Sequence, residues 1–131
     1  MSSESICFPL DGGSLVDVRE VRRYVCKLVG IDHPRIDDIE LLTSEIATNA
    51  VIHSGSGRPS GRLKLTVRRD ERRVRVEITD DGGADSSPHL VSDGLSEHGQ
   101  GLWIVRGLSD ESGSWQDQQG RTTVWFQVAR G

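Results

Sequence analysis

The chain has 131 residues and a formal net charge of −4. This length predicts one domain, residues 1–131, with a single hydrophobic core. The acidic balance argues against direct nucleic-acid binding, because proteins that bind nucleic acid normally carry a clustered basic surface.

Two further features of the composition concern the membrane and the redox environment. No segment approaches the roughly 20 apolar residues of a membrane-spanning helix, and the first residues lack the pattern of a signal peptide. We therefore expect a cytoplasmic protein without membrane contact. Cys7 and Cys26 stand among apolar neighbours without metal-ligand spacing, which predicts two buried, reduced thiols.

The first half of the chain predicts a strand followed by two helices. Residues 5–10 can form an edge strand. Apolar residues keep helical spacing over residues 15–29, and Gly30 ends that pattern. A second helix is expected over residues 37–53, with an acidic first turn that suits the positive end of the helix dipole.

The second half predicts a hairpin, a long loop, a third helix and a last strand. The corresponding segments are residues 63–67 and 74–80 for the hairpin strands, 82–98 for the loop, 101–108 for the helix and 122–128 for the last strand. With the first half, this order predicts an α/β two-layer sandwich. Helices would cover one face of a mixed, mostly antiparallel sheet.

The second predicted helix carries a polar stripe. Glu45, Asn49 and His53 stand at i, i+4 and i+8, so their side chains share one face of the helix. Apolar residues beside the stripe supply a surface that can pack on a core. The helix is therefore expected to pack on the core while it directs three polar groups at a ligand.

Two glycine-containing segments follow the helix. The period-2 pattern of the hairpin points Asp80 inward at the end of an apolar row, and Gly82 allows a sharp turn after it. Further on, Gly99 and Gly101, followed by Leu102, open the third predicted helix, where backbone N–H groups can approach phosphates. The helix stripe and these two segments together predict a nucleotide pocket.

In this order the three segments resemble the N box and the two glycine boxes of the GHKL ATPases, which include histidine-kinase catalytic domains, gyrase and Hsp90. The small size and the spacing Glu45-x-x-x-Asn49-x-x-x-His53 resemble more closely the bacterial anti-sigma-factor serine kinase branch. The resemblance covers roughly residues 10–128. It implies the histidine-kinase-like ATPase (Bergerat) fold, with ATP and Mg²⁺ as cofactors.

The resemblance also implies roles on the adenine side of the pocket. Asp80 would accept a hydrogen bond from the exocyclic amine of adenine, and Gly82 would let the chain turn beside the base. Thr122 would support Asp80 through a water molecule. It is preferred over Thr123 because it shares the inward face of the last strand.

On the phosphate side, the resemblance gives roles to the helix stripe and to the second glycine box, residues 99–102. Asn49 would offer its side-chain oxygen to Mg²⁺, and Glu45 would activate the attacking hydroxyl or a water. His53 either closes the phosphate side or caps the helix C-terminus. The backbone of the second glycine box, including Leu102, would approach the phosphates.

The implied function is that of an ATP-binding anti-sigma-factor-like regulator, which phosphorylates a small antagonist (anti-anti-sigma) protein on serine. A sigma factor is the second implied partner, and the branch works as homodimers. The alternative is a nucleotide-gated binding module that transfers no phosphate, because Glu97 and His98 stand where some kinases of this branch carry a lid arginine. A split histidine kinase is disfavoured, because no dimerising helical hairpin with a phosphoacceptor histidine is present.

Overall fold

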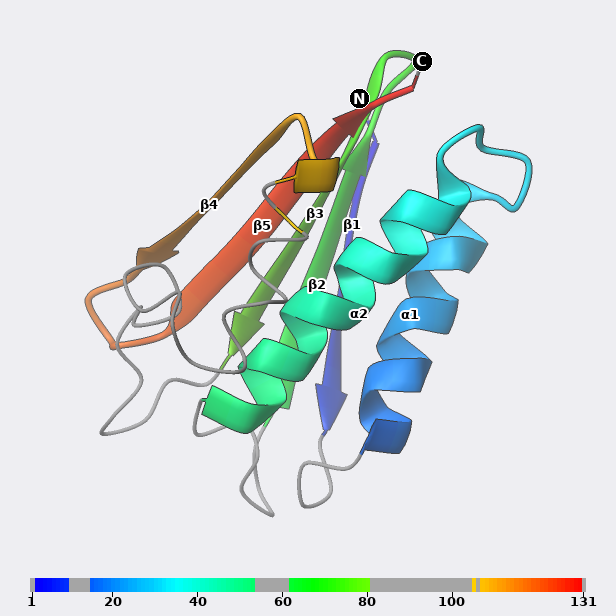
Figure 1. Cartoon of the computed structure of the whole chain (residues 1–131). Helices are drawn as coiled ribbons and strands as arrows, with labels where there is room; N and C mark the ends of the chain where they lie inside the picture. The colour runs from blue at the N-terminus through cyan, green and yellow to red at the C-terminus, as the bar shows by residue number, and fades with distance from the viewer. Residues whose placement is uncertain (1, 10–14, 54–61, 81–104, 106, 131) are drawn as a thin grey trace.

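The structure, a computed structural model, describes residues 2–9, 15–53, 62–80, 105 and 107–130. The elements in chain order are β1 (Ser2–Pro9), α1 (Leu15–Val29), α2 (Ile36–His53), β2 (Arg62–Arg69), β3 (Arg73–Asp80), β4 (Glu111–Gln116) and β5 (Thr122–Ala129). The strands form one sheet, and α1 and α2 lie side by side on one of its faces (Figure 1). The expected α/β sandwich is confirmed. Neither helix is long and apolar enough to cross a membrane.

The sheet has the strand order β1-β2-β3-β5-β4, and each pairing of the described strands is antiparallel. β3 lies at the centre, between β2 and β5, while β1 and β4 form the two edges. Because β3 and β5 run in opposite directions, the last residues of β3 lie beside the first residues of β5. This topology brings residues about 40 positions apart in the sequence together at one end of the sheet.

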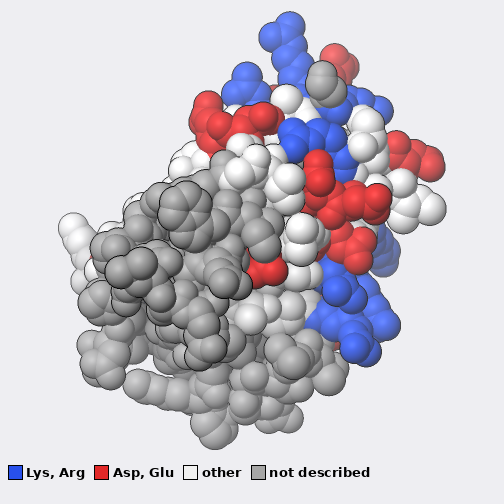
Figure 2. Space-filling view, viewed as in Figure 1, with Lys and Arg blue, Asp and Glu red and all other residues white. Residues whose placement is uncertain are grey.

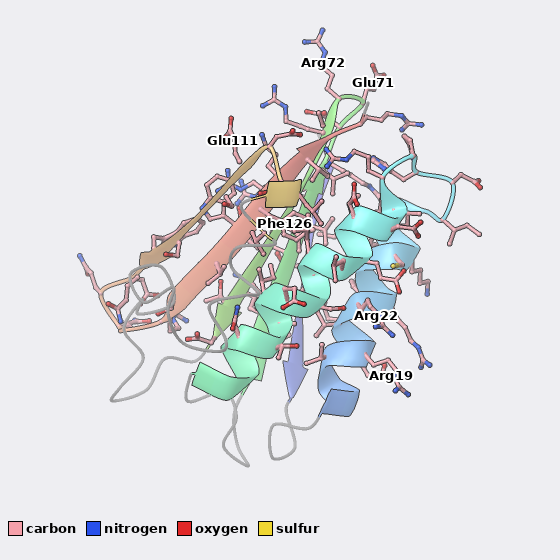
Figure 3. The ribbon with its side chains drawn as sticks, viewed as in Figure 1. Arg19, Arg22, Glu71, Arg72, Glu111 and Phe126 are labelled. Carbon is pink, nitrogen blue, oxygen red and sulfur yellow. The ribbon has the colours of Figure 1, made fainter. Side chains whose placement is uncertain are left out.

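The hydrophobic core fills the space between the helices and the inward rows of the three central strands. Its members from the sheet are Leu63, Leu65, Val67, Val74, Val76, Ile78, Val124, Phe126 and Val128, and those from the helices are Val18, Val21, Val25, Ile39, Leu42, Ile46, Ala47 and Ala50. Phe126 is fully buried and lies between the sheet and α2 (Figure 3). Loss of such a side chain typically costs about 3–5 kcal/mol, so this core holds α2 firmly on the sheet.

Two short connections, after α1 and between β2 and β3, are fixed by hydrogen bonds between residues close in sequence. Gly30 ends α1 with a φ of 97°, a conformation that glycine adopts without steric cost, and its N–H donates to the carbonyl oxygen of Cys26 at 2.8 Å. In the β2–β3 hairpin, the Asp70 carboxylate accepts the backbone N–H groups of Arg72 and Arg73 at 2.7 and 2.9 Å. These two bonds lower the pKa of Asp70 below its usual value. The carboxylate thereby organises a turn whose other side chains are exposed and charged.

The face of the sheet away from the helices carries a polar and aromatic network. The guanidinium of Arg75 stacks on Trp125, 3.9 Å from the ring centroid, and its Nε lies 2.7 Å from the Glu77 carboxylate. That nitrogen is out of line for a hydrogen bond, so the contact is an ion pair. Beside it, the hydroxyls of Thr79 and Thr123 are 2.7 Å apart. This pair ties β3 to β5 next to the sheet end where the candidate site lies.

Two parts of the structure differ from the sequence-based expectations. β4 was not predicted. The expectation of two buried thiols is wrong for Cys7, which is exposed, while Cys26 is half-buried. Side chains alternate along β1, so Ile6 packs against the core and Cys7 points away from it. Of the expected third helix, the described residues 105, 107 and 108 are helical.

Candidate functional site

The end of β3 and the start of β5 meet at the end of the sheet that lies beside the C-terminal turns of α2 (Figure 1). α2 packs against both strands. Its C-terminal half, which carries Glu45 and Asn49, lies at this end of the sheet (Figure 1). This is the region in which the sequence predicts a nucleotide pocket.

Asp80 is the last residue of β3, and it is buried, with 6% of its surface exposed. Leu63 of β2 lies beside it in the sheet, and the backbone N–H of Thr122 on β5 donates to its Oδ1 at 3.3 Å. A carboxylate in an apolar setting is costly unless donors reach it, and its two oxygens can accept several hydrogen bonds. Asp80 can therefore hold a donor group of a ligand at the sheet end.

The two threonines at the start of β5 face opposite sides of the sheet. Thr122 is 3% exposed and shares the inward face with Val124 and Phe126, as expected. Thr123 is also buried, but its hydroxyl pairs with Thr79 on the face away from the helices. Of the two, Thr122 is therefore the one whose hydroxyl lies on the same side as the Asp80 carboxylate.

Asn49 is almost completely buried in α2, with 3% of its surface exposed. Its side-chain nitrogen finds no hydrogen-bond partner in the described part of the chain. A buried amide without partners costs about 1–3 kcal/mol, and its oxygen and nitrogen exchange places on a 180° flip. Asn49 can therefore present its oxygen as a ligand for a hard cation such as Mg²⁺, which usually takes only one or two protein ligands beside phosphates.

Glu45 lies one helical turn before Asn49 and is half-buried. Among the described residues, no ion pair or side-chain hydrogen bond engages its carboxylate. Such a carboxylate is available to accept a proton. The spacing predicted from the sequence therefore places a partly accessible acid-base group next to a buried amide.

Several predicted site residues lie wholly or partly outside the described part of the chain. His53 is the last residue of α2, but its side chain lies outside the described set. The same is true of the residues of both glycine boxes, Gly82, Gly99, Gly101 and Leu102. Their proposed roles remain predictions.

A groove elsewhere on the surface has a different character. It lies between α1 and α2, encloses about 430 Å³, and is lined by Arg22, Arg23, Cys26, Lys27, Ile31 and Glu40. Arg22, which projects from α1 in Figure 3, pairs with Glu40 at 3.4 Å. Burial, followed by the nearby Glu40, raises the pKa of the Cys26 thiol, which disfavours its thiolate form. On this side of the molecule, basic and acidic groups are interleaved (Figure 2).

The arrangement agrees with comparisons to known proteins. Residues 8–128 match the family described as histidine kinase-like ATPase domain. The serine-protein kinase RsbW of Bacillus subtilis is 31% identical over 98 residues, and RsbW of Bacillus pumilus is 30% identical over 100 residues. Each match covers 66% of this chain. The chain spans 61% and 62% of the two relatives, respectively.

Solved structures show the same fold. The chain aligns with the SiaB–SiaC complex of Pseudomonas aeruginosa at a TM-score of 0.58 and 11% identity, covering 95% of this chain and 89% of the other. The catalytic domain of the histidine kinase ThkA gives a TM-score of 0.57 at 15% identity, with 97% of each chain covered. The expected resemblance to the GHKL ATPases and their serine kinase branch is confirmed.

Proposed function

Because the chain belongs to the histidine kinase-like ATPase domain family, we propose that it binds ATP with Mg²⁺ at the sheet end that carries Asp80, Thr122 and Asn49. The observation that carries this proposal is the buried Asp80 carboxylate, held by the Thr122 N–H at the end of an apolar row. A carboxylate acceptor at the end of an apolar row suits a flat purine ring with an exocyclic amine. Gly82 comes two residues after the end of β3 in the sequence and would let the chain turn close to the base.

On the phosphate side, the buried amide of Asn49 would offer its oxygen to the metal. Mg²⁺ bound there with the nucleotide would neutralise charge on the phosphates. The backbone of residues 99–102 would donate N–H groups to the phosphates, and His53 at the end of α2 would close that side or cap the helix.

We further propose that the chain is a protein serine kinase with Glu45 as its base. The hydroxyl oxygen of the acceptor serine attacks the γ-phosphorus, and its proton passes to the Glu45 carboxylate. The bond from the γ-phosphorus to the bridging oxygen breaks, and ADP leaves with the bonding electrons. Glu45 suits this role because it stands one turn from Asn49 and is partly accessible.

The acceptor would be a small antagonist (anti-anti-sigma) protein, and a sigma factor would be the second partner. The support comes from the RsbW relatives, which are serine-protein kinases at about 30% identity. We place the protein in the cytoplasm, where such partners act, and expect a homodimer.

The test is transfer of labelled phosphate from ATP to a candidate antagonist protein that carries an acceptor serine. Labelling of the antagonist, and its absence when the acceptor serine is replaced by alanine, would support the kinase. If the chain binds ATP but labels no antagonist protein, the kinase proposal is contradicted. The nucleotide-gated binding module would then take its place.

A further inference from the structure

The turn between β4 and β5 is organised by the carboxylate of Asp117, at the same end of the sheet as the last residue of β3 (Figure 1). Its Oδ1 accepts the backbone N–H groups of Gln119 and Arg121, each at 2.9 Å, and its Oδ2 lies 2.8 Å from the Nε of Arg121. The hydrogen bond from the Arg121 N–H is the main cause that lowers the pKa of Asp117 below its usual value. The carboxylate is therefore ionised at neutral pH and serves the turn as a permanent acceptor.

Asp117 also holds the turn through its own backbone. Its N–H donates to the carbonyl oxygen of Arg121 at 2.9 Å, and its carbonyl oxygen accepts the N–H of Gly120 at 3.1 Å. Arg121 is thus held by Asp117 at both of its backbone polar groups, the N–H and the C=O.

The C=O of Arg121 and the N–H of Thr122 belong to the same peptide group. A trans peptide group is planar, and its C=O and N–H point in opposite directions. The C=O of this peptide group meets the N–H of Asp117, and its N–H donates to Oδ1 of Asp80 at 3.3 Å. One peptide group therefore links the turn to the buried carboxylate at the end of β3.

The contact between Thr122 and Asp80 joins a backbone donor to a side-chain acceptor. Both residues stand next to the backbone pair that Thr79 of β3 forms with Thr123 of β5. A side chain can rotate about its own bonds, whereas the direction of the N–H is set by the backbone of the turn. The direction of the Thr122 N–H therefore contributes to the orientation of the Asp80 carboxylate.

We propose that Asp117 is a positioning residue for adenine recognition, and this inference rests on the ATP-binding function proposed above. By holding the turn, Asp117 aims the Thr122 N–H at Asp80 and so sets the orientation in which the carboxylate meets the exocyclic amine of adenine. Asp117 acts through Thr122 and Asp80 and touches no atom of the nucleotide.

The backbone hydrogen bonds of the Asp117 carboxylate carry this role, rather than its ion pair with the Arg121 guanidinium. The side chain of Arg121 is 50% exposed and that of Asp117 is 34% exposed, and ion pairs at such positions contribute little because water screens the charges. An asparagine would keep an acceptor for the two N–H groups, and it favours the same kind of turn. Asp117→Asn should therefore keep part of the function that Asp117→Ala loses.

The test compares the affinities of ATP and purine-riboside triphosphate, an analogue that lacks only the exocyclic amine, in D117A, D117N and the wild type. A misaligned Asp80 weakens ATP but leaves the analogue nearly unchanged, because the analogue offers Asp80 no amine. A general loss of order would instead weaken both ligands by the same factor. The matched control is D70A, since the Asp70 carboxylate organises the β2–β3 turn through two backbone N–H groups at the opposite end of the sheet.

In D117A we expect ATP affinity to fall about fivefold, the scale of one hydrogen bond, with the affinity for the analogue changed by less than about twofold. D117N should lie between D117A and the wild type, whereas D70A and R121Q should keep the wild-type ratio of the two affinities. If D117A does not fold, the ratio in D117N decides.

An unchanged ratio in the deciding variant would overturn the inference while the ATP function stands. The same holds for a wild-type chain that binds ATP and the analogue equally well. A wild-type chain that binds no ATP would overturn both the inference and the proposed function.

Discussion

The two ends of the sheet differ in how their polar side chains find hydrogen-bond partners. At the end beside the start of α2, Arg35 donates to three acceptors, and Asp110, just before β4, binds β5 through its backbone and its carboxylate. At the other end, the Asn49 amide nitrogen has no partner among the described residues, although the side chain is almost fully buried. At the first end, the chain itself supplies the hydrogen-bond partners. At the second end, a buried polar group is left to bind a ligand.

This difference in hydrogen bonding predicts different effects of substitutions at the two ends of the sheet. Most buried polar groups in proteins find partners, and one that does not lowers stability. Side chains that serve a ligand can therefore be changed with a large effect on binding or rate and a small effect on stability. Side chains at the end that carries Arg35 and Asp110 should show more effect on stability. The following predictions test this contrast, beginning with the largest expected effect.

Glu45→Gln should change rate most and stability least. Removing a general base typically lowers a rate by about 10² to 10⁴, while the amide keeps the size of the side chain. We expect ATP affinity and the thermal midpoint to stay near wild-type values. Single-turnover phosphorylation of the antagonist protein measures the rate, and a wild-type rate in this variant would remove Glu45 from the chemistry.

Asp80→Asn should abolish most of the ATP affinity. The amide can place a donor where adenine needs an acceptor, at a cost of about 2 kcal/mol or more, or about 30-fold in affinity. The Asn oxygen can still accept the Thr122 N–H, so the fold should remain intact. Calorimetric titration with ATP checks this expectation, and equal affinities of variant and wild type would refute the adenine assignment.

Asn49→Ala should weaken ATP about tenfold in the presence of Mg²⁺ and much less in its absence, because the lost oxygen is a metal ligand. Its stability should change little, since relief of the unpaired amide offsets lost packing.

Thr43→Val is the matched control for Asn49→Ala. Thr43 is also on α2, fully buried and without a partner for its hydroxyl in the described chain, but it belongs to the core face. The Thr43→Val variant should be more stable than the wild type by roughly 1 kcal/mol, and its ATP affinity should be unchanged. A large loss of stability in Asn49→Ala, with no change in metal dependence, would assign Asn49 a structural role.

Asp70→Asn gives the smallest expected effect. The folded-state pKa of Asp70 is lowered by the N–H groups of Arg72 and Arg73, so its contribution to stability is present above the unfolded pKa of about 3.8. That contribution is lost as the pH falls through the lower folded pKa. The Asn variant keeps an acceptor and does not titrate, so its thermal midpoint should fall less between pH 4 and pH 2. Parallel pH profiles would contradict this account of the turn.

The sequence predicts most of the fold, because most elements have a clear apolar period. The two helices and the β2–β3 hairpin follow from their 3.6- and 2-residue patterns, and Gly30 ends α1 as expected. β4 escapes prediction because its residues, Glu-Ser-Gly-Ser-Trp-Gln, show no alternation of apolar side chains. It is an edge strand whose pairing with β5 and contact between Gly113 and Trp125 depend on tertiary structure.

The candidate site divides in a similar way. Strand period alone places Asp80 and Thr122 on the inward face, and the structure puts them in contact across β3 and β5. The contacts of Arg35 with Leu108 and Asp110 could not be predicted, since these residues are more than 70 positions away and no local sequence pattern marks the contacts. Cys7 was misplaced because apolar neighbours in sequence do not fix the face of an edge strand.

The central claim is that the sheet end with Asp80, Thr122 and Asn49 is kept for ATP and Mg²⁺. Calorimetric titration of the wild-type chain with ATP, with and without Mg²⁺, tests it most directly. We predict one ATP per chain, bound more tightly with Mg²⁺ than without it. Absence of binding up to about 1 mM ATP under either condition, an affinity weaker than about −4 kcal/mol, would contradict the claim.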